Sequence, residues 1–251
     1  MGRRVIISGN WKMNKESAGA AELVKGLLAD VKNMSAEREM IIFPPAIYLK
    51  EVSEMTKGSK IKTGAQNMYF KAEGAFTGEN SPKMVKDAGA QYILIGHSER
   101  RHVFGETDAL INQKVKAAYE FGLLPMLCIG ELLEEFKAGK SKDVCKKQLV
   151  EGLKDVSADQ MKSMVIAYEP VWAIGTGEVA TPEIAEDIHK FCREVLTDLY
   201  SAEISSIVPI LYGGSVKADN AAGLIAKENV DGALVGGACL DAASFMGIAK
   251  A

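Results

Sequence analysis

The sequence predicts an α/β protein of the (β/α)8 barrel class, with residues 1–251 forming a single domain. Short apolar segments recur along the whole chain, segments with helical periodicity separate them, and no linker or low-complexity tract interrupts the alternation. Eight strand-and-helix units in 251 residues give roughly 31 residues per unit. That spacing is close to the ~30 residues of a βα repeat, and the total length matches the ~250 residues typical of such a barrel.

The predicted strands are short apolar runs that lack strict alternation of apolar and polar residues. This pattern indicates burial on both faces, as in a parallel sheet. Pro125 and Pro209 fall inside two of the runs, and we expect them near strand entrances because proline cannot donate to a strand ladder. In chain order the runs are Val5–Ile7, Met40–Phe43, Ile61–Thr63, Tyr92–Ile95, Leu123–Ile129, Met164–Ala167, Ile207–Leu211 and Gly232–Val235.

The segments between the strands carry helix signals. Apolar residues at helical spacing form one stripe over residues 23–31 and another over residues 188–199. Ser81–Pro82 and Thr181–Pro182 each combine a favourable N-cap residue with proline at the first helical position. A doubly wound sheet is the rival architecture, but it normally shows a glycine fingerprint at the first turn, which here reads Gly9-Asn10-Trp11-Lys12.

Composition and charge exclude several classes of protein. The net charge is -3 and the longest basic runs are pairs, so we expect no nucleic-acid partner. No apolar stretch approaches the ~20 residues of a membrane span, and the start of the chain shows no signal-peptide core. The four cysteines are widely spaced, which fits reduced buried thiols better than a disulfide frame or a zinc site. We therefore expect a soluble, cytoplasmic protein without a membrane or metal partner.

Catalytic groups of such a barrel lie where strands end, at the C-terminal face. Glycine pairs after the seventh and eighth strands suit a phosphate, because glycine lets backbone N–H groups approach its oxygens. We therefore expect a phosphorylated ligand near an amine, an imidazole and a carboxylate. The strand-end rule selects Asn10 and Lys12, Gln66, His97, Ser98 and Glu99, Cys128 and Glu131, Glu169, Tyr212–Ser215, and Gly236–Gly237.

The three central candidates also have simpler interpretations. A lone lysine such as Lys12 is more often a solvated surface charge, and His97 is equally well a capping or core imidazole. Glu169 follows a buried run and precedes a proline, so it stands at the edge of a core, where an unpaired carboxylate is costly and its pKa can be tuned. The other histidines, His102 and His189, are expected to be structural or exposed. No base stands at a readable spacing from a cysteine, so we expect no thiol nucleophile.

The segment 170–180 is glycine-rich and has two interpretations. Residues 175–180 match the weak G-x-G-x-x-A dinucleotide pattern, but Pro170–Ile174 separate them from the strand, whereas the fingerprint needs the turn at once. A mobile lid is the better interpretation, because a proline begins the segment and Trp172 and Ile174 can cover a ligand. We expect no nucleotide site here.

Five segments together resemble triosephosphate isomerase. The resemblance covers about Val5 to Leu240, and the eleven residues around Glu169 are its most specific part. Cys239 stands where many family members carry serine. The segments are NWKMN (10–14), GHSERR (96–101), AYEPVWAIGTG (167–177), YGGSV (212–216) and GALVGG (232–237).

The resemblance implies a TIM barrel that interconverts dihydroxyacetone phosphate and D-glyceraldehyde 3-phosphate in glycolysis and gluconeogenesis. The reaction would pass through an enediol(ate) without metal or cofactor. The implied catalytic residues are Glu169 as base, His97 as proton shuttle, and Asn10 and Lys12 as groups that polarise the oxygens and attract the dianion. Glu99 would organise Lys12. The implied substrate-binding residues are Asn10, Lys12, Gly175, Ser215, Gly236 and Gly237.

We also expect a homodimer whose contact centres on the loop 66–79. These residues show no clear secondary structure, are long for a barrel connection and carry three aromatic residues, so they are best buried in a partner. By resemblance, Thr77 at the tip reaches the region of the partner subunit's Asn10 and the partner subunit's Lys12.

Two other functions remain open on the residues alone. One is an aldolase-type phosphate-binding barrel in which Lys12 forms a Schiff base, which borohydride would trap. The other is a non-catalytic sugar-phosphate binding protein, which would gain nothing from keeping a base, an imidazole and a lysine together.

Overall fold

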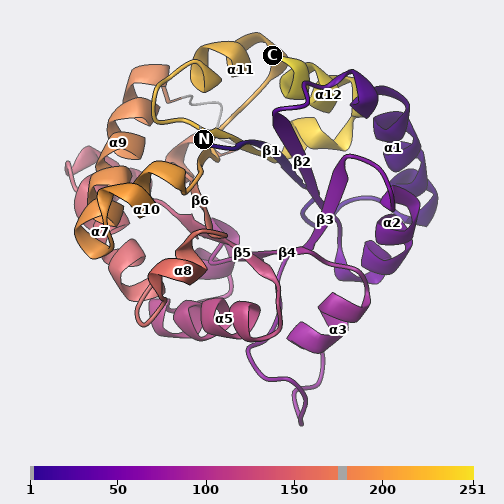
Figure 1. The fold of residues 1–251 in the computed structure, drawn as a ribbon, viewed down its shortest axis with the longest axis horizontal. Helices are drawn as coiled ribbons and strands as arrows, with labels where there is room; N and C mark the ends of the chain where they lie inside the picture. The colour runs from indigo at the N-terminus through magenta and orange to yellow at the C-terminus, as the bar shows by residue number, and fades with distance from the viewer. Residues whose placement is uncertain (1–2, 175–179) are drawn as a thin grey trace.

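The eight strands close into one parallel barrel. The computed structural model describes residues 3–174 and 180–251, in which each strand pairs with the next and β8 pairs with β1. Figure 1 shows the strands as a central ring surrounded by helices, which confirms the predicted (β/α)8 barrel. The strands are β1 (Val5–Asn10), β2 (Arg38–Phe43), β3 (Ile61–Ala65), β4 (Tyr92–Ile95), β5 (Leu124–Ile129), β6 (Val165–Tyr168), β7 (Ile210–Tyr212) and β8 (Gly232–Val235).

The helices begin at the predicted caps. Ser81 Oγ accepts a hydrogen bond from the Met84 N–H (3.2 Å), and Thr181 Oγ1 accepts one from the Ile184 N–H (3.3 Å). Within the described ranges no helix is both long and apolar enough to cross a bilayer. The helices are α1 (Ser17–Asp30), α2 (Leu49–Thr56), α3 (Pro82–Asp87), α4 (Ser98–His102), α5 (Asp108–Glu120), α6 (Leu133–Lys137), α7 (Ser141–Gly152), α8 (Ala158–Met161), α9 (Pro182–Leu199), α10 (Ala202–Ile207), α11 (Ala218–Ile225) and α12 (Ala242–Lys250), with 3-10 turns η1 (Val31–Asn33), η2 (Ala46–Tyr48), η3 (Val171–Ala173) and η4 (Gly237–Leu240).

The strands are buried on both faces, as the unbroken apolar runs predicted. Ile6 belongs to a buried cluster that fills the barrel, whereas its neighbour Ile7 belongs to the cluster between the strands and the helices. Successive side chains of a strand point to opposite faces, so both layers need apolar residues. The inner cluster consists of Ile6, Ile41, Phe43, Tyr92, Leu94, Met126, Cys128, Val165, Ala167, Leu211 and Leu234.

Both prolines lie at strand entrances, as expected. Pro125 is the second residue of β5, and Pro209 directly precedes β7. The predicted run Ile207–Leu211 nevertheless needs correction, because Ile207 ends α10 and the Val208 N–H donates to the Ile204 carbonyl (3.3 Å). The strand can begin only after the proline, so β7 runs from Ile210 to Tyr212.

The loop between β3 and α3 projects from the barrel (Figure 1). At its base Met68 is buried and the Asn67 side-chain oxygen accepts a hydrogen bond from the Lys114 ammonium (2.7 Å). Beyond this anchor most of residues 71–79 are exposed. The loop is thus tied to α5 at one end and stands free of its own barrel at the tip.

Candidate active site

A cavity of about 310 Å³ lies at the C-terminal ends of the strands. Loops that follow β1, β4, β6, β7 and β8 contribute to its wall, so residues far apart in sequence meet there. It combines charged, polar and apolar groups, as small-molecule sites do. Its lining residues are Asn10, Trp11, Lys12, Asn14, His97, Glu169, Ile174, Gly213, Gly214, Ser215, Val216, Lys217, Leu234, Val235, Gly236, Gly237, Ala238 and Leu240.

Lys12 is held in an unusual backbone conformation. Its φ of 51° lies in the left-handed region, which a residue with a side chain adopts only when its surroundings fix it. The Lys12 N–H donates to Asn10 Oδ1 (2.9 Å), and Gln66 Nε2 donates to the Lys12 carbonyl (2.8 Å). The Lys12 ammonium then meets Glu99 Oε1 at 2.6 Å. The side-chain amides of Asn10 and Gln66 therefore fix the backbone of Lys12, and the Glu99 carboxylate fixes its ammonium group.

Glu169 directly follows β6 and is 2% exposed. Its Oε1 lies 2.9 Å from His97 Nε2, and its Oε2 accepts a hydrogen bond from the Ser98 N–H (3.0 Å). Burial raises the pKa of Glu169, but the His97 imidazole and the Ser98 N–H lower it, and the net shift is downward. The carboxylate is therefore charged and available as a base at neutral pH.

His97 caps the short helix α4 with its imidazole. Its Nδ1 accepts a hydrogen bond from the Glu99 N–H (3.2 Å), which favours the neutral tautomer with the proton on Nε2, facing Glu169. Burial lowers the pKa of His97 whereas the Glu169 carboxylate raises it, and the net shift is upward. When a ligand separates His97 from Glu169, the carboxylate raises the pKa of His97 less, whereas burial still lowers it.

The loop after β7 comes close to Glu169 because it contains glycine. A Cβ on Gly213 would lie 2.8 Å from Glu169 Cγ, nearer than real Cβ contacts come. The Gly213 N–H donates to the Tyr168 carbonyl (2.7 Å), which joins the ends of β6 and β7. Ser215, Gly236 and Gly237 donate no backbone hydrogen bond to another residue in the described part of the chain. Their N–H groups are thus available to an anion in the cavity.

Comparison with known proteins identifies the family. A sequence model described as triosephosphate isomerase matches residues 5–251. The chain belongs to the triosephosphate isomerase family. It is 51% identical to a triosephosphate isomerase of Carboxydothermus hydrogenoformans over 248 residues, which cover 99% of this chain and 98% of that protein. It is 48% identical to the one of Fusobacterium nucleatum over 252 residues (99% of both) and 49% identical to the one of Lactococcus lactis subsp. lactis over 251 residues (99% and 98%).

In this family member most of the predicted site residues line one cavity. Gly175 is the exception, because residues 175–179 of the predicted lid segment 170–180 lie outside the described residues. At the near end of the lid Ile174 lines the cavity, as expected of a covering residue. The predicted residues that meet there are Asn10, Lys12, His97, Glu169, Ser215, Gly236 and Gly237.

Other strand-end candidates support the site from behind. Glu131 is fully buried and accepts hydrogen bonds from the Tyr168 hydroxyl (3.0 Å) and the Trp172 indole N–H (2.8 Å). Burial raises the pKa of the Cys128 thiol, which lies inside the barrel, so it stays protonated. All four cysteines are free and buried, as predicted. Within the described ranges no three His, Cys, Asp or Glu side chains gather as a metal-binding group.

The strand-end rule missed several lining residues. Leu234 lies inside β8, and strand alternation from the barrel interior is the signal that would have found it. Lys217 stands two residues after Ser215, but nothing in its neighbourhood marks it as different from a surface lysine. Asn14 and Trp11 belong to the NWKMN segment, but the sequence predicts no role for them. The Asn14 side chain donates to the Trp11 carbonyl (2.7 Å), which fixes the turn after β1.

Proposed function

We propose that this chain interconverts dihydroxyacetone phosphate and D-glyceraldehyde 3-phosphate by proton transfer through an enediol(ate), with Glu169 as the base. The chain is an isomerase of the aldose–ketose class. One observation carries the assignment of residues. A buried carboxylate, an imidazole and an ammonium group lie with two glycine loops around the same cavity.

Glu169 would remove a proton from the carbon next to the substrate carbonyl. Its carboxylate lies 2.9 Å from His97 Nε2 and accepts a hydrogen bond from the Ser98 N–H. Substrate must therefore part Glu169 from His97 before the reaction. A carboxylate that loses these donors in a water-poor cavity becomes a stronger base, because desolvation raises its pKa.

His97, Asn10 and Lys12 would stabilise the oxygens of the intermediate. Negative charge develops on these oxygens as the proton leaves carbon, and fixed donors act strongly on it in a low-dielectric site. The His97 Nε2–H would shuttle a proton between the two oxygens, a role supported by the hydrogen bond that Nδ1 accepts from the Glu99 N–H. The Lys12 charge would also attract the phosphate dianion.

The phosphate would bind at the loops after β7 and β8. This proposal is supported by Ser215, Gly236 and Gly237, which line the cavity, and we include Gly175 of the predicted lid as a further donor. Backbone N–H groups without internal acceptors are the usual partners of such an anion. The second glycine loop runs directly into η4 (Gly237–Leu240).

Two further proposals concern assembly and location. We propose a homodimer through the loop 66–79, supported by the exposed side chains of Phe76 on that loop and Met84 in α3, the helix that follows it. Phe76 is 39% exposed and Met84 is 59% exposed. We propose a cytoplasmic location, supported by four buried free thiols and the glycolytic family.

The test is a coupled assay for conversion of glyceraldehyde 3-phosphate, combined with borohydride treatment. We expect rapid isomerisation and no labelling of Lys12, because isomerisation through an enediol(ate) forms no Schiff base for borohydride to reduce. A Schiff-base aldolase would label Lys12. A binding protein would show neither activity nor label.

A further inference from the structure

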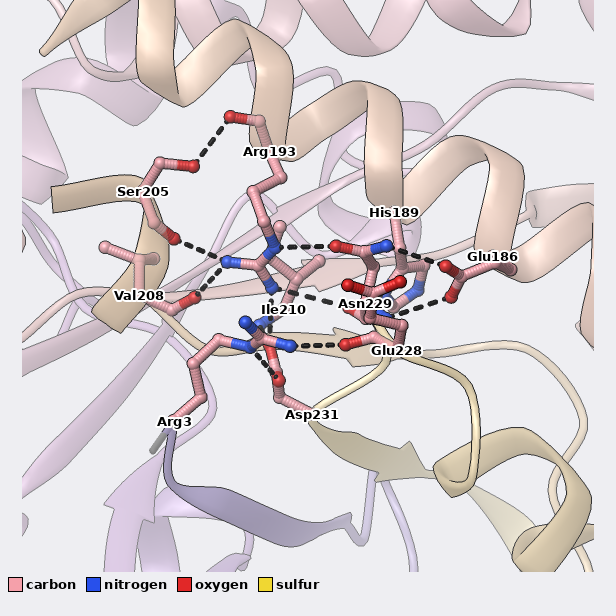
Figure 2. A network of polar contacts seen from close by, with 10 residues as sticks. All are labelled: Arg3, Glu186, His189, Arg193, Ser205, Val208, Ile210, Glu228, Asn229 and Asp231. Carbon is pink, nitrogen blue, oxygen red and sulfur yellow. Dashed lines mark hydrogen bonds and ion pairs between the residues drawn. The ribbon is translucent and has the colours of Figure 1, made fainter. Parts of the chain in front are cut away.

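His189 is a fully buried imidazole that the proposed reaction does not use. It belongs to α9, and Figure 2 places it beside Asn229, which precedes β8. Its Nδ1 lies 3.2 Å from the Asn229 carbonyl oxygen. A carbonyl only accepts hydrogen bonds, so the proton of the ring is on Nδ1.

The Asn229 carbonyl is a fixed acceptor. The backbone N–H and the side-chain amide of Asn229 donate to the Glu186 carboxylate (3.0 and 2.6 Å). The side-chain oxygen of Asn229 accepts a hydrogen bond from Arg193 Nε (3.0 Å). Glu186, His189 and Arg193 follow one another at helical spacing, so all three project from the same side of α9 (Figure 2). Three side chains on one face of α9 therefore all contact Asn229, two residues before Asp231, which directly precedes β8.

Arg193 also links this hydrogen-bonded group of Glu186, His189 and Asn229 to the strands. Its NH2 donates to Asp231 Oδ2 (2.7 Å), and the same oxygen accepts from the Ile210 N–H at the start of β7 (2.8 Å). Arg3 binds the other oxygen of Asp231 (2.5 Å). These hydrogen bonds therefore fix α9 relative to β7 and β8 at the end of the barrel opposite the cavity.

The His189 ring also packs against two tyrosines of the layer between the strands and the helices. The ring meets Tyr168 edge-on (centroids 5.7 Å apart, 87°) and lies 6.5 Å from the ring of Tyr212. These tyrosines are the last residues of β6 and β7, directly before Glu169 and Gly213. A displacement of either tyrosine would be passed on to the base, because the Gly213 N–H bonds the Tyr168 carbonyl and Gly213 packs against Glu169.

We propose that His189 is a positioning residue, whose ring supports Tyr168 and Tyr212 so that Glu169 keeps its place relative to the phosphate loop at Gly213. The hydrogen bond to Asn229 orients the ring. The proposal rests on the proposed function of Glu169 as base. Catalysis is sensitive to such placement, since an error of about 1 Å can cost about 100-fold in rate.

Two variants separate the ring from the hydrogen bond. His189→Asn keeps a donor toward the Asn229 carbonyl but removes the ring, and His189→Phe keeps the ring but removes the donor. We expect H189N to lose at least about 10-fold in kcat with a smaller change in KM, and H189F to stay within about 3-fold of wild type. If H189N does not fold, His189→Gln takes its place in the same comparison.

The pH profile distinguishes positioning from mere loss of stability. If the base loosens from His97 and Ser98, the acidic limb of kcat/KM moves to higher pH in H189N, because those two groups lower the pKa of Glu169. Val195→Ala is the matched control, since Val195 is buried on the same helix and its loss should lower Tm without moving kcat or the acidic limb.

A folded H189N with wild-type kcat, KM and pH profile would overturn the proposal. An H189F variant as slow as H189N would also overturn it, because the hydrogen bond rather than the ring would then matter. Wild-type protein without isomerase activity would instead contradict the proposed function.

Discussion

At the scale of single residues, the buried imidazole of His189 should make stability depend on pH. Burial lowers its pKa from 6.5 to about 3; the charge of Arg193 adds to this effect, and the hydrogen bond that the His189 Nδ1–H donates to the Asn229 carbonyl opposes it. The unfolded chain therefore binds a proton below pH 6.5 that the folded protein does not bind until about pH 3. The contribution of His189 to the free energy of unfolding is therefore fully present above pH 6.5. Below that value the contribution falls by about 1.4 kcal/mol per pH unit until about pH 3.

His189→Phe removes this titration. Urea unfolding at pH 7 and pH 5, at one protein concentration, should show wild type losing about 2 kcal/mol more than H189F between the two values. An equal loss in both proteins would place the acid sensitivity in other groups.

The residue scale also shows what sequence reasoning can and cannot reach. The position of Glu169 was predictable because a strand end in a barrel defines one rim, whatever the neighbouring strands contain. The role of Gln66, by contrast, depends on the strained backbone of Lys12. The contacts of His189 with Tyr168 and with Asn229 join distant segments, and no local pattern marks them.

At the scale of elements, the turn after β7 should tolerate no side chain at Gly213. An added Cβ would meet Glu169 Cγ at 2.8 Å and the Tyr168 carbonyl at 3.0 Å, so Gly213→Ala must displace Glu169, the proposed base. We expect at least about 10-fold lower kcat, measured in the coupled assay. Gly223→Ala is the control, because Gly223 lies in α11 with open space around its Cβ position.

The control has an expected outcome of its own. Alanine is favoured over glycine in a helix by roughly 0.5–1 kcal/mol, so G223A should unfold at slightly higher urea concentration with unchanged kcat. If G213A matched G223A in activity, the close packing of the β7 turn against the base would not matter for the reaction.

Strand positions were predictable to within a few residues, and the errors have physical causes. The sequence run at Ile207 was apolar enough for a strand, but its first residues complete the last turn of α10 and Pro209 blocks the ladder. At β2 the strand begins earlier than predicted, at Arg38 and Glu39, because these polar residues lie at the barrel end. Glu39 there accepts hydrogen bonds from Tyr92 and Arg4, which an apolar pattern cannot reveal.

At the scale of the whole molecule, the loop 66–79 should join two copies of the chain. Phe76 is 39% exposed on this loop and packs only on Tyr69 among the rings of the described residues, 4.6 Å away. Phe76→Glu would place a charge in the proposed interface, so we expect sedimentation at micromolar concentration to show more monomer and the assay to show less activity. Leu199→Glu is the control, because Leu199 is equally exposed but lies at the end of α9.

An F76E protein that sediments and reacts like L199E would exclude this loop from the contact. The single domain over residues 1–251 remains a prediction at this scale, although all eight strands belong to one closed barrel. Assembly was less predictable than the barrel because a sequence shows which residues are apolar, not which of them the folded protomer leaves uncovered.

The central claim is that Glu169 is the base of an isomerase, and Glu169→Gln tests it most directly. Glutamine keeps the size of the side chain and can still contact Ser98, but it cannot take up a proton from carbon. General bases typically contribute ~10²–10⁴-fold, so we predict that E169Q loses at least about 100-fold in kcat while it folds normally and binds inorganic phosphate as wild type does. Glu134→Gln, at an exposed carboxylate of α6, should react like wild type. Near-normal turnover by E169Q would contradict the account and assign the base to another residue.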